Sequence, residues 1–186
     1  MNVSEAITSR RSIRRFEPEA PTREQLEAIM RAATFAPNHK LTQPWRFYVM
    51  GPEARSAYGR ALGVRKAKKA PDEAAGAVIR ERTADEHRAI PCMIAVAMTV
   101  SDNAETREED YAAVMMSVAL LSLAAVDQGL GTHIKTGGVM QDDAARAAVG
   151  VPDGQKIVAI LNVGRPAEQP PARERGALES FVNWVD

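Results

Sequence analysis

The feature that most constrains the fold is the segment 109–128, which is apolar on nearly every side of a helix. Within its most apolar part, residues 111–126, the only interruptions besides Tyr111 are Ser117 and Ser122, and Gly129 follows as the expected C-cap residue. A helix without a polar face is normally buried. The apolar part is also shorter than the ~20 residues that cross a bilayer. We therefore expect a central core helix and no membrane partner.

Two further apolar runs, residues 91–100 and 156–164, have the length of strands and predict the inner strands of a sheet. Residues 46–50 are aromatic and β-branched and precede Gly51-Pro52, which indicates a third strand. Residues 131–137 form either a short strand or an extended loop. Helices and strands are intermixed without a regular βαβ alternation, which favours an α+β fold with a mixed sheet surrounded by helices.

Several helices are expected around this sheet. Thr22 and Gln25 form a capping box that opens a helix, and Pro37 ends it. Shorter helices are expected at residues 3–9, 53–63 and 142–149. Residues 64–88 are charged, rich in alanine and almost free of aliphatic anchors, so we interpret them as a mobile helical excursion over the body or over a site.

The composition limits the classes of function. The length of 186 residues suits one domain, residues 1–186. Lys+Arg and Asp+Glu number 24 each, a balance that argues against a nucleic-acid partner. Cys92 is the only cysteine, so no intrachain disulfide can form. The polar N-terminus has no signal-peptide pattern, and we expect a cytoplasmic protein.

Most familiar catalytic motifs are absent from the sequence. There is no Walker A loop, no Gly-X-Ser-X-Gly, and no complete glycine fingerprint for a dinucleotide. The three histidines, His39, His87 and His133, lack the spacing of metal ligands, so no metal is expected. Hydrolase and Rossmann functions are therefore disfavoured.

Three polar clusters remain. Residues 10–15, Arg-Arg-Ser-Ile-Arg-Arg, present guanidinium groups suited to a phosphomonoester, or they form a solvated basic turn. Residues 36–47 are a polar loop that enters a strand, which suits either a binding loop or an ordinary connection with a buried tryptophan. Residues 131–138 form a glycine-rich turn with a cation and hydroxyls, which suits either a flat anionic ligand or a plain turn.

In this order, the three clusters resemble the nitroreductase family of FMN-dependent oxidoreductases. The opening motif runs from Arg10 to Phe16, and the second signature from Ala36 to Phe47. The long helix that ends in Gln128-Gly129-Leu130-Gly131, and the strand before Gly164-Arg165-Pro166, complete the pattern. The length of the chain and the His39-Lys40 pair suggest the small, minimal branch of the family.

The resemblance implies a largely antiparallel mixed sheet and a homodimer, with a C-terminal arm exchanged between subunits and FMN at both interface sites. It places Arg10 and Ser12 at the phosphate and ribityl chain, with Arg11 beside them, and Arg14 at the pyrimidine edge of the ring. It implies these further cofactor contacts: Phe35 and His39 from the partner subunit, then Ile134, Lys135 and Thr136, and more weakly Arg165. The chain departs from its relatives here, because Trp, Arg and Ser are expected at 134–136 and arginine at 35.

The implied reaction takes hydride from NAD(P)H through bound FMN to a small-molecule acceptor, a nitroaromatic, quinone or other conjugated compound, by a ping-pong mechanism. No side-chain nucleophile is needed, because the cofactor supplies the chemistry. Three alternatives stay open: a specialised flavoenzyme such as a reductive dehalogenase, a non-catalytic or regulatory FMN-binding protein, and a ligand-free interaction module.

Overall fold

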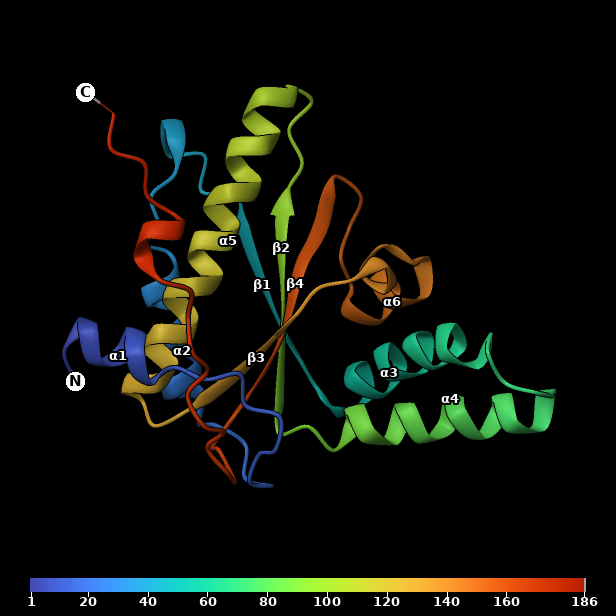
Figure 1. Ribbon diagram of the computed structural model, residues 1–186. Coiled ribbons are helices and arrows are strands. Elements are labelled where there is room, and N and C mark those ends of the chain that lie inside the picture. The colour runs from blue at the N-terminus through green and yellow to red at the C-terminus, as the bar shows by residue number, and fades with distance from the viewer. Residues whose placement is uncertain (186) are drawn as a thin grey trace.

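The computed structural model describes residues 1–185 and contains a four-stranded sheet in the order β1-β2-β4-β3 (Figure 1). The strands are β1 (Trp45–Met50), β2 (Cys92–Thr99), β3 (Gly131–Lys135) and β4 (Gln155–Gly164). All three strand pairs are antiparallel. An isolated parallel bridge between Ser12 and Thr132 brings the N-terminal segment alongside β3. The expected α+β fold with a mixed, largely antiparallel sheet is confirmed.

Helices cover both faces of the sheet (Figure 1). They are α1 (Val3–Ser9), α2 (Arg23–Ala33), α3 (Pro52–Ala67), α4 (Glu73–Arg88), α5 (Ala104–Asp127) and α6 (Asp143–Val149). Short 3-10 turns occur at His39–Leu41, Gly138–Gln141 and Leu178–Ser180. Alternate residues of a strand face opposite sides. On β2, Ile94 and Val96 accordingly pack toward α2 and α5, whereas Met93 and Ala95 pack toward α3 and α6.

Helix α5 is the central helix that the apolar segment predicted. Val114, Val118, Leu121 and Ala125 are buried against the sheet and α2. The helix begins at Ala104, five residues earlier than expected, because the Asn103 side chain accepts a hydrogen bond from the Thr106 backbone N–H at 2.9 Å. By length and composition alone α5 could cross a membrane, but its buried residues belong to the protein core.

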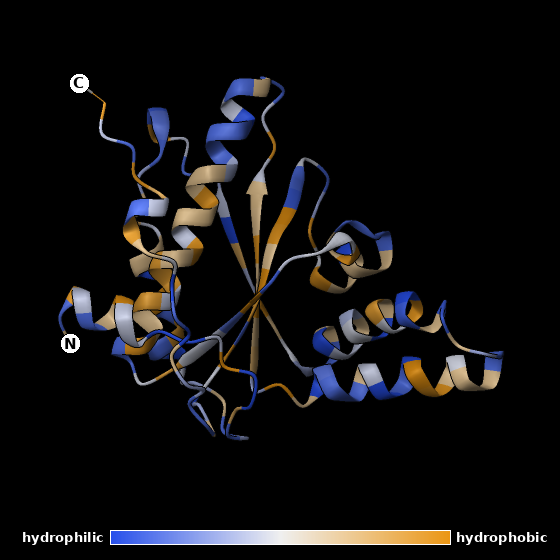
Figure 2. Ribbon diagram, viewed as in Figure 1, coloured by the Kyte–Doolittle hydropathy of each residue, from blue (hydrophilic) through white to orange (hydrophobic). Residues whose placement is uncertain are grey.

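Helices α3 and α4 form an antiparallel pair that extends away from the sheet (Figure 1). The helix expected at 53–63 continues to Ala67, and most of the segment 64–88 is helical, as predicted. The pair packs through glycines in place of aliphatic side chains. A Cβ on Gly59 would lie 2.6 Å from the Thr83 carbonyl oxygen, and one on Gly63 would lie 2.8 Å from the Arg80 Cα. Figure 2 shows hydrophilic and hydrophobic residues mixed along both helices of this pair.

The C-terminal segment lies along the N-terminal one and then extends into solvent. The Ala167 N–H donates to the Arg15 carbonyl at 3.1 Å, and the Gln169 amide donates to the Ser9 carbonyl at 3.5 Å. Beyond these contacts, Phe181 is 71% exposed and Trp184 is 92% exposed. Two aromatic side chains therefore have no cover within one copy of the chain, and the exchange of this arm in a dimer stays a prediction.

Candidate functional site

The arginine motif is fixed to the sheet by Ile13. Its backbone N–H donates to the Thr132 carbonyl at 2.9 Å, and its side chain is buried. Gly131 makes this close approach possible, because a Cβ there would overlap the Ile13 Cγ1 and lie 3.0 Å from the Ile13 Cβ. Since neighbouring residues of an extended segment face opposite sides, burial of Ile13 directs Ser12 and Arg14 outward, and both are exposed.

A pocket of about 640 Å³ opens at this motif and is closed on its other side by the C-terminal segment. Its lining residues are Ile7, Thr8, Arg10, Arg11, Ser12, Arg14, His133, Glu168, Pro170, Pro171, Ala172, Arg173 and Arg175. Glu168 is the only carboxylate among them, and it already lies 3.6 Å from Arg15. Five arginines against one shared carboxylate make the pocket strongly attractive to an anion such as a phosphomonoester.

Arg11 has a different role from the other arginines of the motif. Its Nη1 donates to the Thr8 carbonyl at 2.7 Å and to its neighbour Arg10's carbonyl at 3.0 Å. The Arg11 Nε is buried without a hydrogen-bond partner. A guanidinium that binds the last carbonyls of a helix stabilises the helix end. Arg11 therefore holds the C-terminal end of α1 and shapes the wall of the pocket, while Arg10 and Arg14 complete its lining.

Strand β3 carries the residues of the glycine-rich turn on opposite faces. His133 lines the arginine pocket, and Lys135 is half-buried two residues further along the same face. Burial lowers the pKa of His133, and the charges of Lys135 and Arg14 lower it further. Burial also lowers the pKa of Lys135. Ile134 packs against the core on the α5 side, and Thr136 is exposed just beyond the strand.

The second polar loop is bound by two carboxylates of α5. The His39 Nδ1 lies 2.9 Å from both Glu109 carboxylate oxygens. The Thr42 hydroxyl donates to Asp110 at 2.6 Å. Phe35, just before this loop, is 79% exposed. Within one copy, Phe35 and His39 do not line the arginine pocket, and their contact with a cofactor held by a partner subunit stays a prediction.

The backbone of this loop is strained. Lys40, Leu41 and Gln43 have φ values of 54°, 53° and 44°. Residues other than glycine rarely adopt positive φ, and such strain gathers at functional sites. The Asn38 side chain supports the loop by accepting a hydrogen bond from the Gln43 backbone N–H at 3.0 Å. Trp45 at the end of the loop is buried, as the alternative of an ordinary connection expects, so a binding role for this loop stays a prediction.

Some residues of the pocket were not predicted, and six predicted cofactor contacts lie outside its lining: Phe35, His39, Ile134, Lys135, Thr136 and Arg165. Arg165 follows β4 and accepts a hydrogen bond from the Glu17 N–H through its carbonyl, but its side chain is not part of the lining. Arg173 and Arg175 do line the pocket. Their only sequence signal is an Arg-Glu-Arg triplet after two prolines. His133 lies within the glycine-rich turn, but nothing in the sequence distinguished it from its neighbours.

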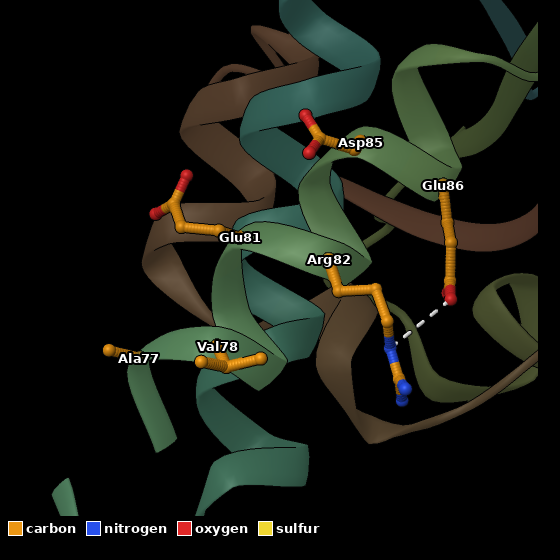
Figure 3. A pocket seen from close by; sticks show the side chains of 6 residues that line it. All are labelled: Ala77, Val78, Glu81, Arg82, Asp85 and Glu86. Atoms are coloured by element: carbon orange, nitrogen blue, oxygen red, sulfur yellow. Dashed lines mark ion pairs between the residues drawn. The ribbon is translucent and has the colours of Figure 1, made fainter. Parts of the chain in front are cut away.

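A second hollow, of about 620 Å³, lies on the outer face of α4 and is open to solvent. Figure 3 shows that its six lining residues all come from that one helix: Ala77, Val78, Glu81, Arg82, Asp85 and Glu86. Arg82 and Glu86 form an ion pair at 3.4 Å. None of its polar groups is buried without a partner, so this face has no sign of a ligand site. Within residues 1–185, no three acidic, histidine or cysteine side chains gather as metal ligands.

Comparisons with known proteins agree with the geometry. YdjA of Escherichia coli K12, described as a candidate NAD(P)H nitroreductase, is 33% identical over 172 residues, which cover 89% of each chain. YfhC of Bacillus subtilis 168, described in the same terms, is 28% identical over 93% of this chain and 89% of its own.

Solved structures show the same fold. A nitroreductase-like family protein from Bacillus cereus superposes with a TM-score of 0.86 at 27% identity, over 100% of this chain and 97% of that one. A nitroreductase with bound FMN from Desulfitobacterium hafniense superposes with a TM-score of 0.75 at 22% identity, over 100% of both chains. The sequence model of the Nitroreductase family matches residues 7–165. The chain therefore belongs to the nitroreductase family.

Proposed function

We propose that this protein is an FMN-dependent oxidoreductase that passes electrons from NAD(P)H through bound FMN to an organic acceptor. The observation that carries the proposal is the arginine pocket, which has an excess of guanidinium groups and opens beside strand β3. The curated relatives named as NAD(P)H nitroreductases support the donor, and the neighbour with bound FMN supports the cofactor.

The pocket fits the phosphate end of FMN. Arg10 and Arg14 line it from the N-terminal motif, and Arg173 and Arg175 line it from the C-terminal segment. Guanidinium forks match phosphate oxygens and bind them through charge-assisted hydrogen bonds. The Ser12 hydroxyl is placed to bind the phosphate or the ribityl chain. Because Arg165 does not line the pocket, we assign the distal part of the phosphate site to the two arginines of the C-terminal segment.

Strand β3 extends from this phosphate end to Lys135, and we propose that the flavin ring lies along it. Lys135 would place a cation beside the ring, where positive charge favours the reduced form. Ile134 would contribute its backbone, since its side chain is part of the core. Thr136 would contact the ring from beyond the strand. FMN itself supplies the redox chemistry, so the protein has to bind, orient and exclude water. Donor and acceptor would use one exposed face in turn, which predicts ping-pong kinetics.

The active unit is proposed to be a homodimer with each site at the subunit interface. One side of α5 carries an apolar stripe at helical spacing, in which Ala112, Met116 and Ala119 are exposed and Leu123 is half-buried. Such a surface usually marks an interaction site. Phe35 lies near the strained loop and is also uncovered. A second copy would bury both surfaces and bring Phe35 and His39 to its partner's cofactor.

The FMN affinity of pocket variants tests the proposal. Arg14→Gln and Arg173→Gln each remove one phosphate contact, which we expect to raise the Kd for FMN by about 10- to 100-fold, since a hydrogen bond to a charged group contributes about 1.5–3 kcal/mol. Arg31→Gln is the control, because Arg31 is exposed on α2 and does not line the pocket. Flavin fluorescence quenching gives the Kd. Equal affinity in all three variants would contradict the proposed phosphate site.

A further inference from the structure

His133 is the only residue from strands β1 to β4 among those that line the arginine pocket. It lies on β3, the edge strand of the sheet, and its side chain is half-buried. The other lining residues come from α1, the arginine motif and the C-terminal segment. Sites built on strands are held more precisely than sites built on loops. The sheet therefore fixes the position of His133 within the pocket.

The charged groups around His133 are almost all cations. Burial lowers the pKa of His133, and the charges of Lys135 and Arg14 lower it further. The one carboxylate of the lining, Glu168, lies 3.6 Å from Arg15. Like charges disfavour a protonated imidazole, so His133 is neutral at about pH 7 when no anion is bound. The charged groups of the lining and of the same face of β3 are Arg10, Arg11, Arg14, Glu168, Arg173, Arg175 and Lys135.

A buried amide lies directly across the sheet from His133. His133 and Asn162 are partners in the antiparallel register of β3 and β4. Directly opposed residues share one face of a sheet, with Cβ atoms about 4.5–5.5 Å apart. Asn162 is 5% exposed, and its Oδ1 has no hydrogen-bond partner. A buried acceptor without a donor is unfavourable, and the imidazole opposite is within reach to supply one.

This arrangement suits a protonated imidazole once an anion is bound. A neutral imidazole donates from one ring nitrogen only, whereas an imidazolium donates from both. One N–H can then donate to the Asn162 Oδ1 while the other faces the pocket. A phosphate held by the arginines also supplies the negative charge that favours the protonated ring. Binding of the anion and binding of the proton therefore favour each other.

We propose that His133 is a proton-dependent ligand of the cofactor phosphate, which it binds as an imidazolium while Asn162 positions it by accepting its other N–H. The inference rests on the proposed function, because it needs FMN in the arginine pocket, and it adds the regulation of that site by pH. His133 binds its proton more tightly in the complex than in the free protein. The Kd for FMN therefore rises with pH until His133 is neutral in both states.

The Kd for FMN, measured by flavin fluorescence quenching from about pH 6.5 to about pH 8.5, tests the proposal. A phosphomonoester has lost most of its second proton above about pH 6, so the charge of the ligand changes little over this range. We expect the wild-type Kd to rise about 10-fold, the effect of one pKa unit caused by a nearby opposite charge. In His133→Gln the Kd should stay constant. Riboflavin, which lacks the phosphate, is the control ligand, and its Kd should not respond to pH in either protein.

Variants of Asn162 separate a positioning role from a structural one. Asn162→Leu keeps the approximate size of the side chain but removes the acceptor, so the rise in Kd with pH should become smaller. Asn162→Asp supplies a charged acceptor, which favours the protonated ring, so the rise should move to higher pH. Opposite changes in the pH profile, with riboflavin binding retained, are not expected from damage to the fold.

Three outcomes would overturn the inference. A wild-type Kd for FMN that stays constant over this pH range would do so and would leave the proposed function standing. A pH dependence that persists in His133→Gln but disappears in Lys135→Met would assign the proton to the lysine. A protein that binds no FMN at any of these pH values would contradict the proposed function and, with it, the role of His133.

Discussion

The contact between Ile13 and Gly131 gives the sharpest test of how the fold positions the arginine pocket. In Gly131→Ala, the new Cβ would overlap the Ile13 Cγ1, whereas carbon atoms in contact normally stay about 3.5–4.0 Å apart. Overpacking of this kind costs about 1–3 kcal/mol. Ile13→Ala removes a buried side chain, a change that costs about 2–5 kcal/mol. In the double variant, the shortened side chain at position 13 lacks the overlapping atom, so the new methyl group at position 131 occupies part of the space that Ile13 vacates.

Urea denaturation of the wild type, both single variants and the double variant measures this coupling. We expect the double variant to lose less stability than the sum of the single losses, by about 1 kcal/mol or more, within the range found for residues in contact. The Kd for FMN should rise in Gly131→Ala as well, because displacing Ile13 moves Ser12 and Arg14. Strictly additive losses, or an unchanged Kd for FMN, would refute the argument that this contact sets the pocket.

Three other predictions concern the helices. Gly59→Ala should lower the Tm by about 2–4 °C for each kcal/mol by which its clash with the Thr83 carbonyl exceeds the ~1 kcal/mol gain in helix propensity. Gly76→Ala, whose new Cβ would lie 3.3 Å or more from side-chain atoms of Arg80, Ala67 and Glu73, should raise the Tm by a few degrees. Equal shifts in thermal melts would contradict the packing. Burial lowers the pKa of His87, and the charges of two nearby lysines lower it further. The unfolded chain therefore binds the proton more tightly than the folded chain does, and the free energy of unfolding should fall as the pH drops below about 6.5. His87→Gln should therefore weaken the dependence of Tm on pH between about 7.5 and 5.5, and an unaltered slope would exclude this role. Met116→Glu should convert the proposed homodimer into monomers in light scattering, because it puts a charge in the exposed apolar stripe of α5, and an intact dimer would place the interface elsewhere.

The apolar pattern predicted the core well, because segments that are buried on all sides are apolar along their whole length. The inner strands β2 and β4 and the central helix α5 all followed from apolar runs. The capping box at Thr22 predicted the start of α2 to the residue. The order of the three polar clusters identified the family.

What the pattern could not predict depends on small residues and on distant contacts. The α3–α4 pair packs through Gly59 and Gly63, and glycines leave no hydrophobic periodicity to detect. Arg173 and Arg175 join the pocket through the return of the C-terminal segment to α1, where Gln169 and Ser9 meet across 160 positions of the chain. No local pattern encodes such a contact.

The second signature shows a different limit. Its residues are those that the family resemblance named, yet His39 is held by Glu109 and does not face the arginine pocket of its own chain. A sequence motif identifies the residues that contact a cofactor, but it does not show whether they contact the cofactor of their own chain or that of a partner. The exposed Phe35 and the positive φ angles of the loop are compatible with the proposed homodimer, in which a second copy would complete the site.

The most direct test of the proposed function is the visible absorption spectrum of the purified protein, recorded without oxygen before and after addition of NADH or NADPH. The account predicts a yellow protein with bound FMN whose flavin absorption bleaches on addition of the donor and returns when an acceptor is added. A colourless protein that takes up no added FMN would contradict the cofactor assignment. A flavin that stays oxidised under excess NADH and NADPH would contradict the oxidoreductase function and favour a non-catalytic FMN-binding protein.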